Sequence, residues 1–187
     1  MVRNSTLCKS FCAIALLLMF NLLLDNFCNA QELFDIARTG TVEQMTKYLK
    51  KHPDQLNSIS EHGSSPFLLA AYNGNNEVAM LLIEKGADLK QCYPEGSVLY
   101  ALIYKNNLVL LDTVLTKGIN VNDTCNFDQF GYPIHFALAL QRYDVVERLV
   151  LHDLDLTVKD PQGRTIEQLL VLYNDPKYYE IFKQYEK

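Results

Sequence analysis

A stretch of 25 residues occurs three times along this chain at a nearly constant offset. The first copy begins at Ser65, the second begins 32 residues later at Ser97, and the third begins a further 35 residues on at Tyr132. A recurrence with this period predicts an array of stacked units, because one unit of this size cannot bury its apolar face alone. Matching positions are apolar in every copy, as in the set Phe67, Leu99 and Ile134.

Each copy predicts two short antiparallel helices. The first helix is expected to start after Ser65 or Ser97 in two copies, because a serine hydroxyl can accept a hydrogen bond from a free backbone N–H group. The second helix has apolar residues at the i, i+3, i+4 spacing of a buried stripe. We expect the break between helices at Gly74, Asn106 and Gln141, and the end of the second helix at Gly86, Gly118 and Asp153.

These motifs resemble the ankyrin repeat. Residues 65–70 (SPFLLA) and 132–137 (YPIHFA) look like the family's Thr-Pro-Leu-His-x-Ala signature, and residues 86–88 (GAD) match its turn. The middle copy departs from the signature, with Val98 in place of proline and Tyr100 in place of histidine. The resemblance implies an all-α solenoid of about five helix–turn–helix units with β-hairpin fingers: an N-terminal cap at 31–57, repeats at 58–90, 91–122 and 123–157, and a C-terminal cap at 158–187.

The N-terminal 30 residues have the layout of a cleavable signal peptide. Arg3 and Lys9 precede an apolar run over residues 11–24, and small residues follow it up to Ala30. The run is 14 residues long, shorter than the roughly 18–20 that span a bilayer, although a retained anchor is the alternative. We therefore expect cleavage before Gln31 and export to the periplasm or the medium, with no membrane attachment afterwards.

Removal of residues 1–30 leaves Cys92 and Cys125 as the remaining cysteines of the chain. They are 33 residues apart, about one repeat, and each falls in a predicted finger. Neighbouring fingers in such a stack lie about 10 Å apart, whereas a disulfide needs Cα atoms roughly 4.4–6.8 Å apart. The longer spacing before the third copy could let that finger lean toward Cys92. We expect a disulfide, because two free thiols suit an oxidising compartment poorly.

Composition and motifs argue against several functions. The formal net charge of −5 makes nucleic acid an unexpected partner. The four histidines show no metal-ligand spacing with cysteine or carboxylate residues, and no phosphate loop or nucleophile motif occurs. The family resemblance gives His135 a structural role at the signature position. We expect neither an enzyme nor a protein that uses a cofactor or a metal.

A protein-binding surface is the remaining expectation. The resemblance implies docking on the inner helices and on the fingers, here about residues 56–64, 89–96, 121–131 and 156–163. Large exposed aromatic residues are enriched at interfaces, although finger rings could instead fold back onto a neighbouring finger. The predicted binding residues are Arg38, Tyr72, Tyr93, Glu95, Tyr104, Phe127, Asp128 and Phe130.

Two functional classes remain open at this stage. Small exported ankyrin proteins of bacteria serve as self-protection or immunity factors against periplasmic hydrolases and secreted toxins, and the chain resembles these. That resemblance implies a monomeric, stoichiometric inhibitor with one specific protein partner. The alternative is a general scaffold, or a secreted effector that binds a host protein. A hydrolase or toxin gene next to this one would favour the first class.

Overall fold

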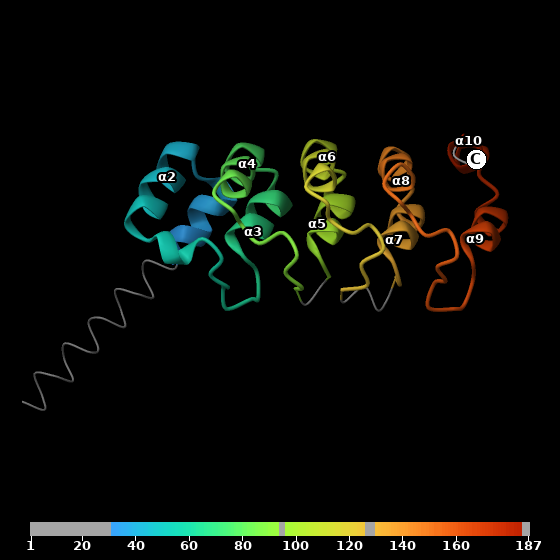
Figure 1. Cartoon of the computed structure of the whole chain (residues 1–187), viewed down its shortest axis with the longest axis horizontal. Coiled ribbons are helices and arrows are strands. Elements are labelled where there is room, and N and C mark those ends of the chain that lie inside the picture. The colour runs from blue at the N-terminus through green and yellow to red at the C-terminus, as the bar shows by residue number, and fades with distance from the viewer. Residues whose placement is uncertain (1–30, 94–95, 126–129, 185–187) are drawn as a thin grey trace, which may run out of the picture.

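The computed structural model describes residues 31–93, 96–125 and 130–184, so the predicted signal peptide lies outside the described residues (Figure 1). Helices form the regular structure of this part of the chain, as the repeat pattern predicts. Residues 31–39 are helical and precede α2 (Val42–Lys51) and the 3-10 helix η1 (Pro53–Gln55). The helix pairs that follow are α3 (Pro66–Asn73) with α4 (Asn76–Glu84), α5 (Val98–Lys105) with α6 (Leu108–Thr116), α7 (Pro133–Ala139) with α8 (Tyr143–Val150), and α9 (Ile166–Tyr173) with α10 (Pro176–Lys183).

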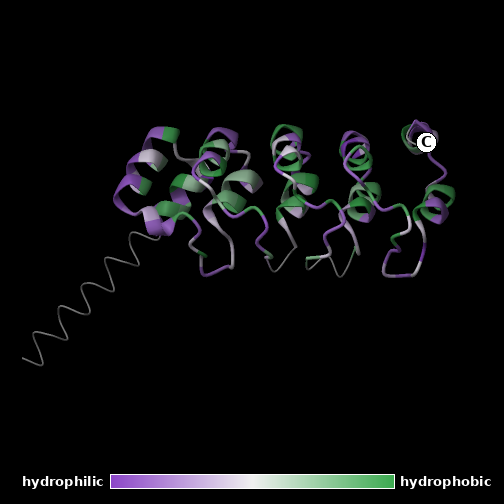
Figure 2. Ribbon diagram, viewed as in Figure 1, coloured by the Kyte–Doolittle hydropathy of each residue, from purple (hydrophilic) through white to green (hydrophobic). Residues whose placement is uncertain are grey.

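The helices form two rows. Helices α3, α5, α7 and α9 make the inner row, and α2, α4, α6, α8 and α10 make the outer row, with the connecting fingers projecting on one side (Figure 1). Neighbours within a row pack together, as α3 does with α5 and α4 with α6. Apolar side chains concentrate where the helices face each other (Figure 2). The hydrophobic core is therefore continuous along the array, as stacked repeats require.

The helix ends form where the sequence pattern predicts them. The Ser65 hydroxyl caps α3 by accepting a hydrogen bond from the backbone N–H of Leu68, at 3.1 Å. Gly74, Asn106 and Gln141 adopt the left-handed conformation at the three breaks between helices, with φ of 74°, 54° and 54°. This conformation reverses the chain within two or three residues, which places the outer helix antiparallel to the inner one.

Polar side chains at the start of the outer helices link neighbouring units. The Asn75 amide donates hydrogen bonds to the Ala37 and Gly40 carbonyls of the preceding unit, at 3.2 and 2.9 Å. One unit later, the Asn107 amide donates to the Asn76 side chain at 2.7 Å. Two units after Asn75, the Arg142 guanidinium donates to the Tyr104 carbonyl at 3.0 Å. These bonds satisfy backbone and side-chain groups between units and fix the stacking register.

The predicted β-hairpin fingers are reduced to turns. In the described part of the fingers, pairing is limited to two isolated antiparallel bridges, Tyr93 with Gly96 and Lys159 with Thr165. Tyr93 and Gly96 exchange backbone hydrogen bonds of 3.0 and 3.1 Å and lie only three residues apart. Pairing does not extend beyond these bridges in the described residues, so the fingers there do not form strand ladders. Along the described chain, no helix has the length and apolar character that a bilayer crossing needs.

Candidate protein-binding surface

One position of the inner helices is at least partly exposed in every unit. Tyr72 and Tyr104 expose 39% and 44% of their surface there, and Arg38 is half-buried. Arg38 pairs with Asp35 one turn earlier on the same helix, with Nη1 and Oδ1 2.9 Å apart. The position therefore presents side chains to solvent along the whole inner row. Its occupants are Arg38, Tyr72, Tyr104, Ala139 and Leu172.

Five rings from three consecutive units form a continuous aromatic row, defined here as Tyr72, Tyr104, Tyr100, Phe136 and Phe130. Tyr72 and Tyr104 are parallel across the α3–α5 boundary, with centroids 6.1 Å apart. Tyr104 is parallel to Tyr100 one turn earlier at 6.3 Å, and Tyr100 lies 4.7 Å from Phe136 of α7. Phe130, from the third finger, packs on Phe136 at 4.5 Å. The row thus runs from the exposed inner face to the base of a finger.

Lys105 adds a positive charge to the exposed end of this row. Its ammonium nitrogen lies 4.1 Å from the centroid of the Tyr72 ring and 5.7 Å from that of Tyr104. Such a cation–π contact at an exposed site contributes about 0.5–1 kcal/mol. It also restricts the rings on both sides of the α3–α5 boundary before any partner arrives.

A groove lies beside the row, between α3 and α5. Its volume is about 280 Å³, and aliphatic and aromatic side chains make up most of its walls. Small side chains at Ser64, Ser97 and Ala101 keep the floor open between the larger residues. The remaining lining residues are Leu68, Leu69, Tyr72, Tyr93 and Tyr100.

The structure corrects the expected exposure of Tyr93. We expected this ring to project from the second finger, yet only 2% of its surface is exposed. Its hydroxyl shares a 2.7 Å hydrogen bond with the Ser65 hydroxyl of the preceding unit. Burial raises the pKa of Tyr93, so the phenol in this bond stays neutral. Tyr93 therefore shapes the groove from below instead of presenting a free ring.

The other predicted finger residues divide into two groups. Phe130 is half-buried against Phe136, so its ring folds back on its own unit at one end of the aromatic row. Glu95, Phe127 and Asp128 lie outside the described residues.

A disulfide joins the second and third fingers. Cys92 and Cys125 are bonded, with Cα atoms 5.6 Å apart. Cys125 is buried and Cys92 is exposed. The bond connects the unit that carries the groove to the unit that follows it. It therefore fixes the spacing of two fingers at the middle of the array.

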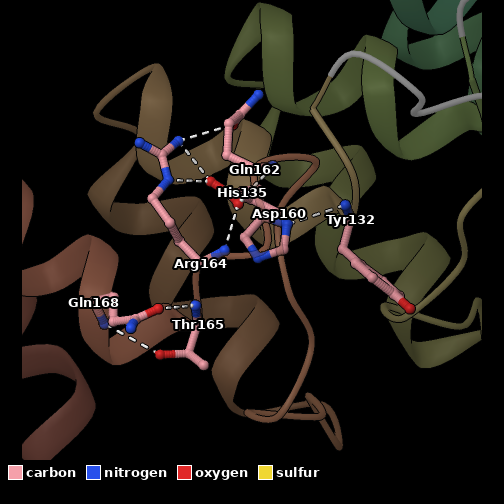
Figure 3. Close-up of polar contacts among 7 residues, drawn as sticks. All are labelled: Tyr132, His135, Asp160, Gln162, Arg164, Thr165 and Gln168. Carbon is pink, nitrogen blue, oxygen red and sulfur yellow. Dashed lines mark hydrogen bonds and ion pairs between the residues drawn. The ribbon is translucent and has the colours of Figure 1, made fainter.

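The buried signature histidine of α7 lies beside the polar turn of the last finger, where Asp160 is buried (Figure 3). The ring nitrogen Nδ1 of His135 accepts a hydrogen bond from the Tyr132 backbone N–H at 3.2 Å. In the adjacent finger, the Asp160 carboxylate accepts bonds from the Arg164 backbone and side chain at 2.8 and 2.6 Å, and from the Gln162 backbone at 3.0 Å. These contacts organise the finger turn and the start of α9, which gives His135 a structural environment.

Burial affects the titration of His135 and Asp160. It lowers the pKa of His135, although the Asp160 carboxylate opposes the shift. Burial also raises the pKa of Asp160, but the hydrogen bonds and charge of Arg164 outweigh that effect and hold the pKa below its usual range. The histidine is thus neutral and the aspartate ionised near neutral pH. Within the described residues, no group of three or more His, Cys, Asp and Glu side chains is placed to hold a metal ion.

Comparison with known sequences agrees with this architecture. The family model named Ankyrin repeat matches residues 62–92, which contain α3 and α4. The human transient receptor potential cation channel subfamily V member 6 is 23% identical over 172 residues, covering 81% of this chain and 22% of the channel. An ankyrin repeat protein of fowlpox virus is 23% identical over 126 residues, 66% of this chain and 28% of the viral protein. These matches support the resemblance of this chain to ankyrin repeat proteins.

A shorter match has higher identity. The human NAD-capped RNA hydrolase is 38% identical over 52 residues, which is 28% of this chain and 11% of the hydrolase. The chain therefore spans between 11% and 28% of the length of these relatives. The feature that these matches support in this chain is the ankyrin repeat. Ankyrin repeats imply a protein-binding module.

Three residues of the aromatic row and its surroundings were not anticipated: Tyr100, Lys105 and Phe136. Tyr100 and Tyr104 are four residues apart, a spacing that puts both rings on one face of α5 and could have revealed the pair. Lys105 directly follows Tyr104, but nothing in the sequence indicates that it reaches back over Tyr72. Phe136 follows the signature histidine, where an aliphatic or aromatic residue is ordinarily assigned to the core.

Proposed function

We propose that this chain is an exported protein-binding module that acts as a stoichiometric inhibitor or immunity factor. Its partner would be one specific extracytoplasmic enzyme or toxin, bound through the inner helices and the adjoining fingers. The observation that carries the proposal is the exposed end of the aromatic row, where Tyr72 and Tyr104 are stacked and partly exposed on the inner face of two consecutive units.

The geometry of the row suits tight binding to a protein. Aromatic rings supply most of the energetic hot spots of protein interfaces, together with arginine. Tyr72 and Tyr104 are already parallel to each other, and Lys105 covers the Tyr72 ring. Because stacking restricts these side chains in the free protein, less conformational entropy is lost when a partner binds.

The groove can take part in binding a protein partner. Small-molecule pockets usually measure about 300–1,000 Å³ and enclose most of the ligand. The groove beside Tyr72 and Tyr100 is about 280 Å³ and lies on the surface between two helices. It has room for an apolar side chain that a partner inserts, while the rings beside it contact the partner's surface.

Two features support an extracytoplasmic location for this binding. Residues 1–30 have the layout of a signal peptide, and the Cys92–Cys125 disulfide belongs to an oxidising compartment. The resemblance to exported immunity proteins suggests that the partner is a hydrolase or a toxin of the producing cell. Binding one partner with one compact surface then gives a one-to-one complex.

Affinity capture from the periplasmic or secreted fraction of the producing cell tests this function. The wild-type protein should retain one protein that a Tyr104→Ala bait loses, while an Ala139→Ser bait, altered at the equivalent exposed position of α7, should retain it. The captured protein is then titrated with the wild-type chain. Loss of its activity at a one-to-one ratio supports inhibition, whereas unchanged activity in a stable complex indicates a scaffold. Equal capture by all three baits, or by none, contradicts binding through the aromatic row.

A further inference from the structure

On each inner helix, the residue just before the exposed inner-face position shows which neighbouring unit the helix packs against. Ala71, Ile103 and Leu138 occupy it in the repeats and are at most 1% exposed, and Ala37 of the first unit is 0% exposed. Ala37 is buried although it belongs to the first helical unit of the array. The side chain at this position therefore faces the following unit. The equivalent residue of α9 is Val171, which is 64% exposed.

The outer helices give the same result independently. Ala79, Leu111 and Val146 occupy equivalent positions of α4, α6 and α8, and each is 0% exposed. In α10 the equivalent residue is Tyr179, which is 42% exposed. Both helices of the last unit therefore carry apolar side chains at positions that contact the next unit elsewhere in the array.

Tyr179 lines a groove beside α9 and α10, the helices at the C-terminal end of the array, together with Ile166, Leu170 and Phe182. Its volume is about 560 Å³, and Leu156, 47% exposed, contributes a further apolar side chain. Val171 lies one helical turn after Glu167, which lines the groove, so both share one face of α9. The C-terminal face is defined here by Leu156, Glu167, Val171, Tyr179 and Lys183.

The charges on this face are self-complementary. Glu167 of α9 replaces the buried residues Phe67, Leu99 and Ile134 of the repeats, and Lys183 of α10 lies across the groove from the α9 side. A two-fold axis between these two residues would set the carboxylate of each copy against the ammonium group of the other. A face that carries one charge of each sign beside an apolar centre matches the requirement of an isologous contact.

The opposite end of the array has a different character. The groove formed by residues 31–39 and α2 is lined mainly by polar and charged side chains, with Glu32, Asp35, Gln44, Lys47 and Lys51 among them. A C-terminal face packed there would bring its apolar side chains against charged groups. Head-to-tail stacking of copies is therefore disfavoured, whereas contact between two identical C-terminal faces buries Val171, Tyr179 and Leu156.

We propose that two copies of this chain pack C-terminal face against C-terminal face to form a closed two-fold dimer. This departs from the monomer expected from the sequence, because a sequence comparison treats the last unit as a cap and does not show how much apolar surface it exposes. The dimer leaves the aromatic row of each copy accessible on α3, α5 and α7. Self-association is thus independent of the function proposed above.

Sedimentation of the purified protein over a concentration series, without reductant, tests the dimer. The wild type should show a monomer–dimer equilibrium with no larger species. Glu167→Lys alone and Lys183→Glu alone place like charges across the axis, and each should weaken dimerisation by at least about tenfold. The double exchange restores opposite charges and should recover most of the wild-type dissociation constant. Lys47→Glu, a charge reversal at the polar end, is the matched control and should change nothing.

A second variant tests the apolar contact of the dimer separately from the Glu167–Lys183 charge pair. Tyr179→Lys adds a charge to the apolar part of the face at an exposed position, so it should abolish the dimer while the helical circular dichroism signal is retained. A wild type that remains monomeric at the highest attainable concentration overturns the proposal. The proposal is also overturned if the double exchange dimerises no more tightly than the single reversals, or if Lys47→Glu disrupts the dimer.

Discussion

The molecule exposes two apolar surfaces for different structural reasons. The rings of Tyr72 and Tyr104 occupy an inner-helix position that is at least partly exposed in all five units. Val171 and Tyr179 occupy positions that are buried in every other unit and are exposed at the C-terminal end alone. The aromatic surface therefore lies on the face that all units leave exposed. The C-terminal surface is the kind that packs between units elsewhere, and no further unit covers it within the described chain.

This difference indicates what each surface binds. The aromatic row combines stacked rings, a cation and a groove, features that favour a foreign protein partner. The C-terminal face retains the kind of side chains that the units use on each other, with opposite charges at Glu167 and Lys183. In a repeat protein, exposure therefore has to be compared with the equivalent residues of other units before an exposed apolar residue is assigned a role.

The largest expected effect contrasts the same position in two units. Leu138→Ala removes a side chain that is 1% exposed between α7 and the last unit, so the free energy of unfolding should fall by about 2–5 kcal/mol. Val171→Ala, at the equivalent exposed site, should change it by about 0.5 kcal/mol or less in the monomer. Urea denaturation at low protein concentration measures both. Equal losses would mean that Val171 is packed in the monomer and that the comparison between surfaces is wrong.

A second prediction concerns the covalent link beside the aromatic row. Replacing both Cys92 and Cys125 with serine opens a loop of 33 residues, and the entropy model predicts a loss of about 3–4 kcal/mol. The C-terminal face lies two units away from Cys92, so the dimer dissociation constant should be unchanged. Thermal unfolding and sedimentation of the same variant test the two statements together.

Thiol counting supplies the control for this prediction. The wild-type protein, denatured without reductant, should show no free thiol at Cys92 or Cys125 and should run as a monomer on a denaturing non-reducing gel. Two free thiols from these residues would show that the fingers are not linked in the protein. The serine variant would then be expected to unfold like the wild type.

The smallest expected effect arises at the junction between the two regions, where α7 meets the last unit. His135 has a lowered pKa in the folded protein, so the unfolded chain takes up its proton more readily. Its contribution to stability should be fully present above the ordinary histidine pKa of about 6.5 and should decline as the pH falls below it. The lowered pKa of Asp160 adds a separate loss at pH values below the usual aspartate range.

Urea unfolding at several pH values between about pH 8 and pH 5 tests the histidine contribution. A His135→Gln variant should be less stable at neutral pH but should lose less stability than the wild type as the pH falls through 6.5. Parallel pH dependences in the two proteins would contradict the buried, neutral histidine.

The repeat pattern is sufficient to predict most of the fold. Left-handed residues recur at offsets of 32 and 35 residues, so Gly74, Asn106 and Gln141 mark the same chain reversal although only one of them is glycine. The offset of 32 residues also places Tyr72 beside Tyr104. Hairpin fingers were expected, but the described part of the fingers has only two isolated bridges. The period of the repeat does not determine whether a ladder forms, because a ladder depends on the turn geometry of each short connection.

The candidate site is less predictable than the fold because it depends on single side-chain contacts between units. Tyr93 is buried because its hydroxyl meets Ser65, a residue 28 positions earlier. Tyr100 joins Phe136 across a boundary where the two residues do not occupy equivalent repeat positions. Lys105 reaches Tyr72 only because its flexible chain folds back over the unit boundary. Periodicity identifies the inner face but does not identify these pairings.

The most direct test of the central claim measures partner binding and self-association on the same two variants, Tyr104→Ala and Tyr179→Ala. Tyr104→Ala should weaken the complex with the captured partner by about 1–4 kcal/mol and leave the dimer unchanged. Tyr179→Ala should weaken the dimer and leave partner affinity unchanged. Calorimetry for the complex and sedimentation for the dimer give the four values. If either variant impairs both associations while remaining folded, the two surfaces are not separate and the distinction drawn between them is contradicted.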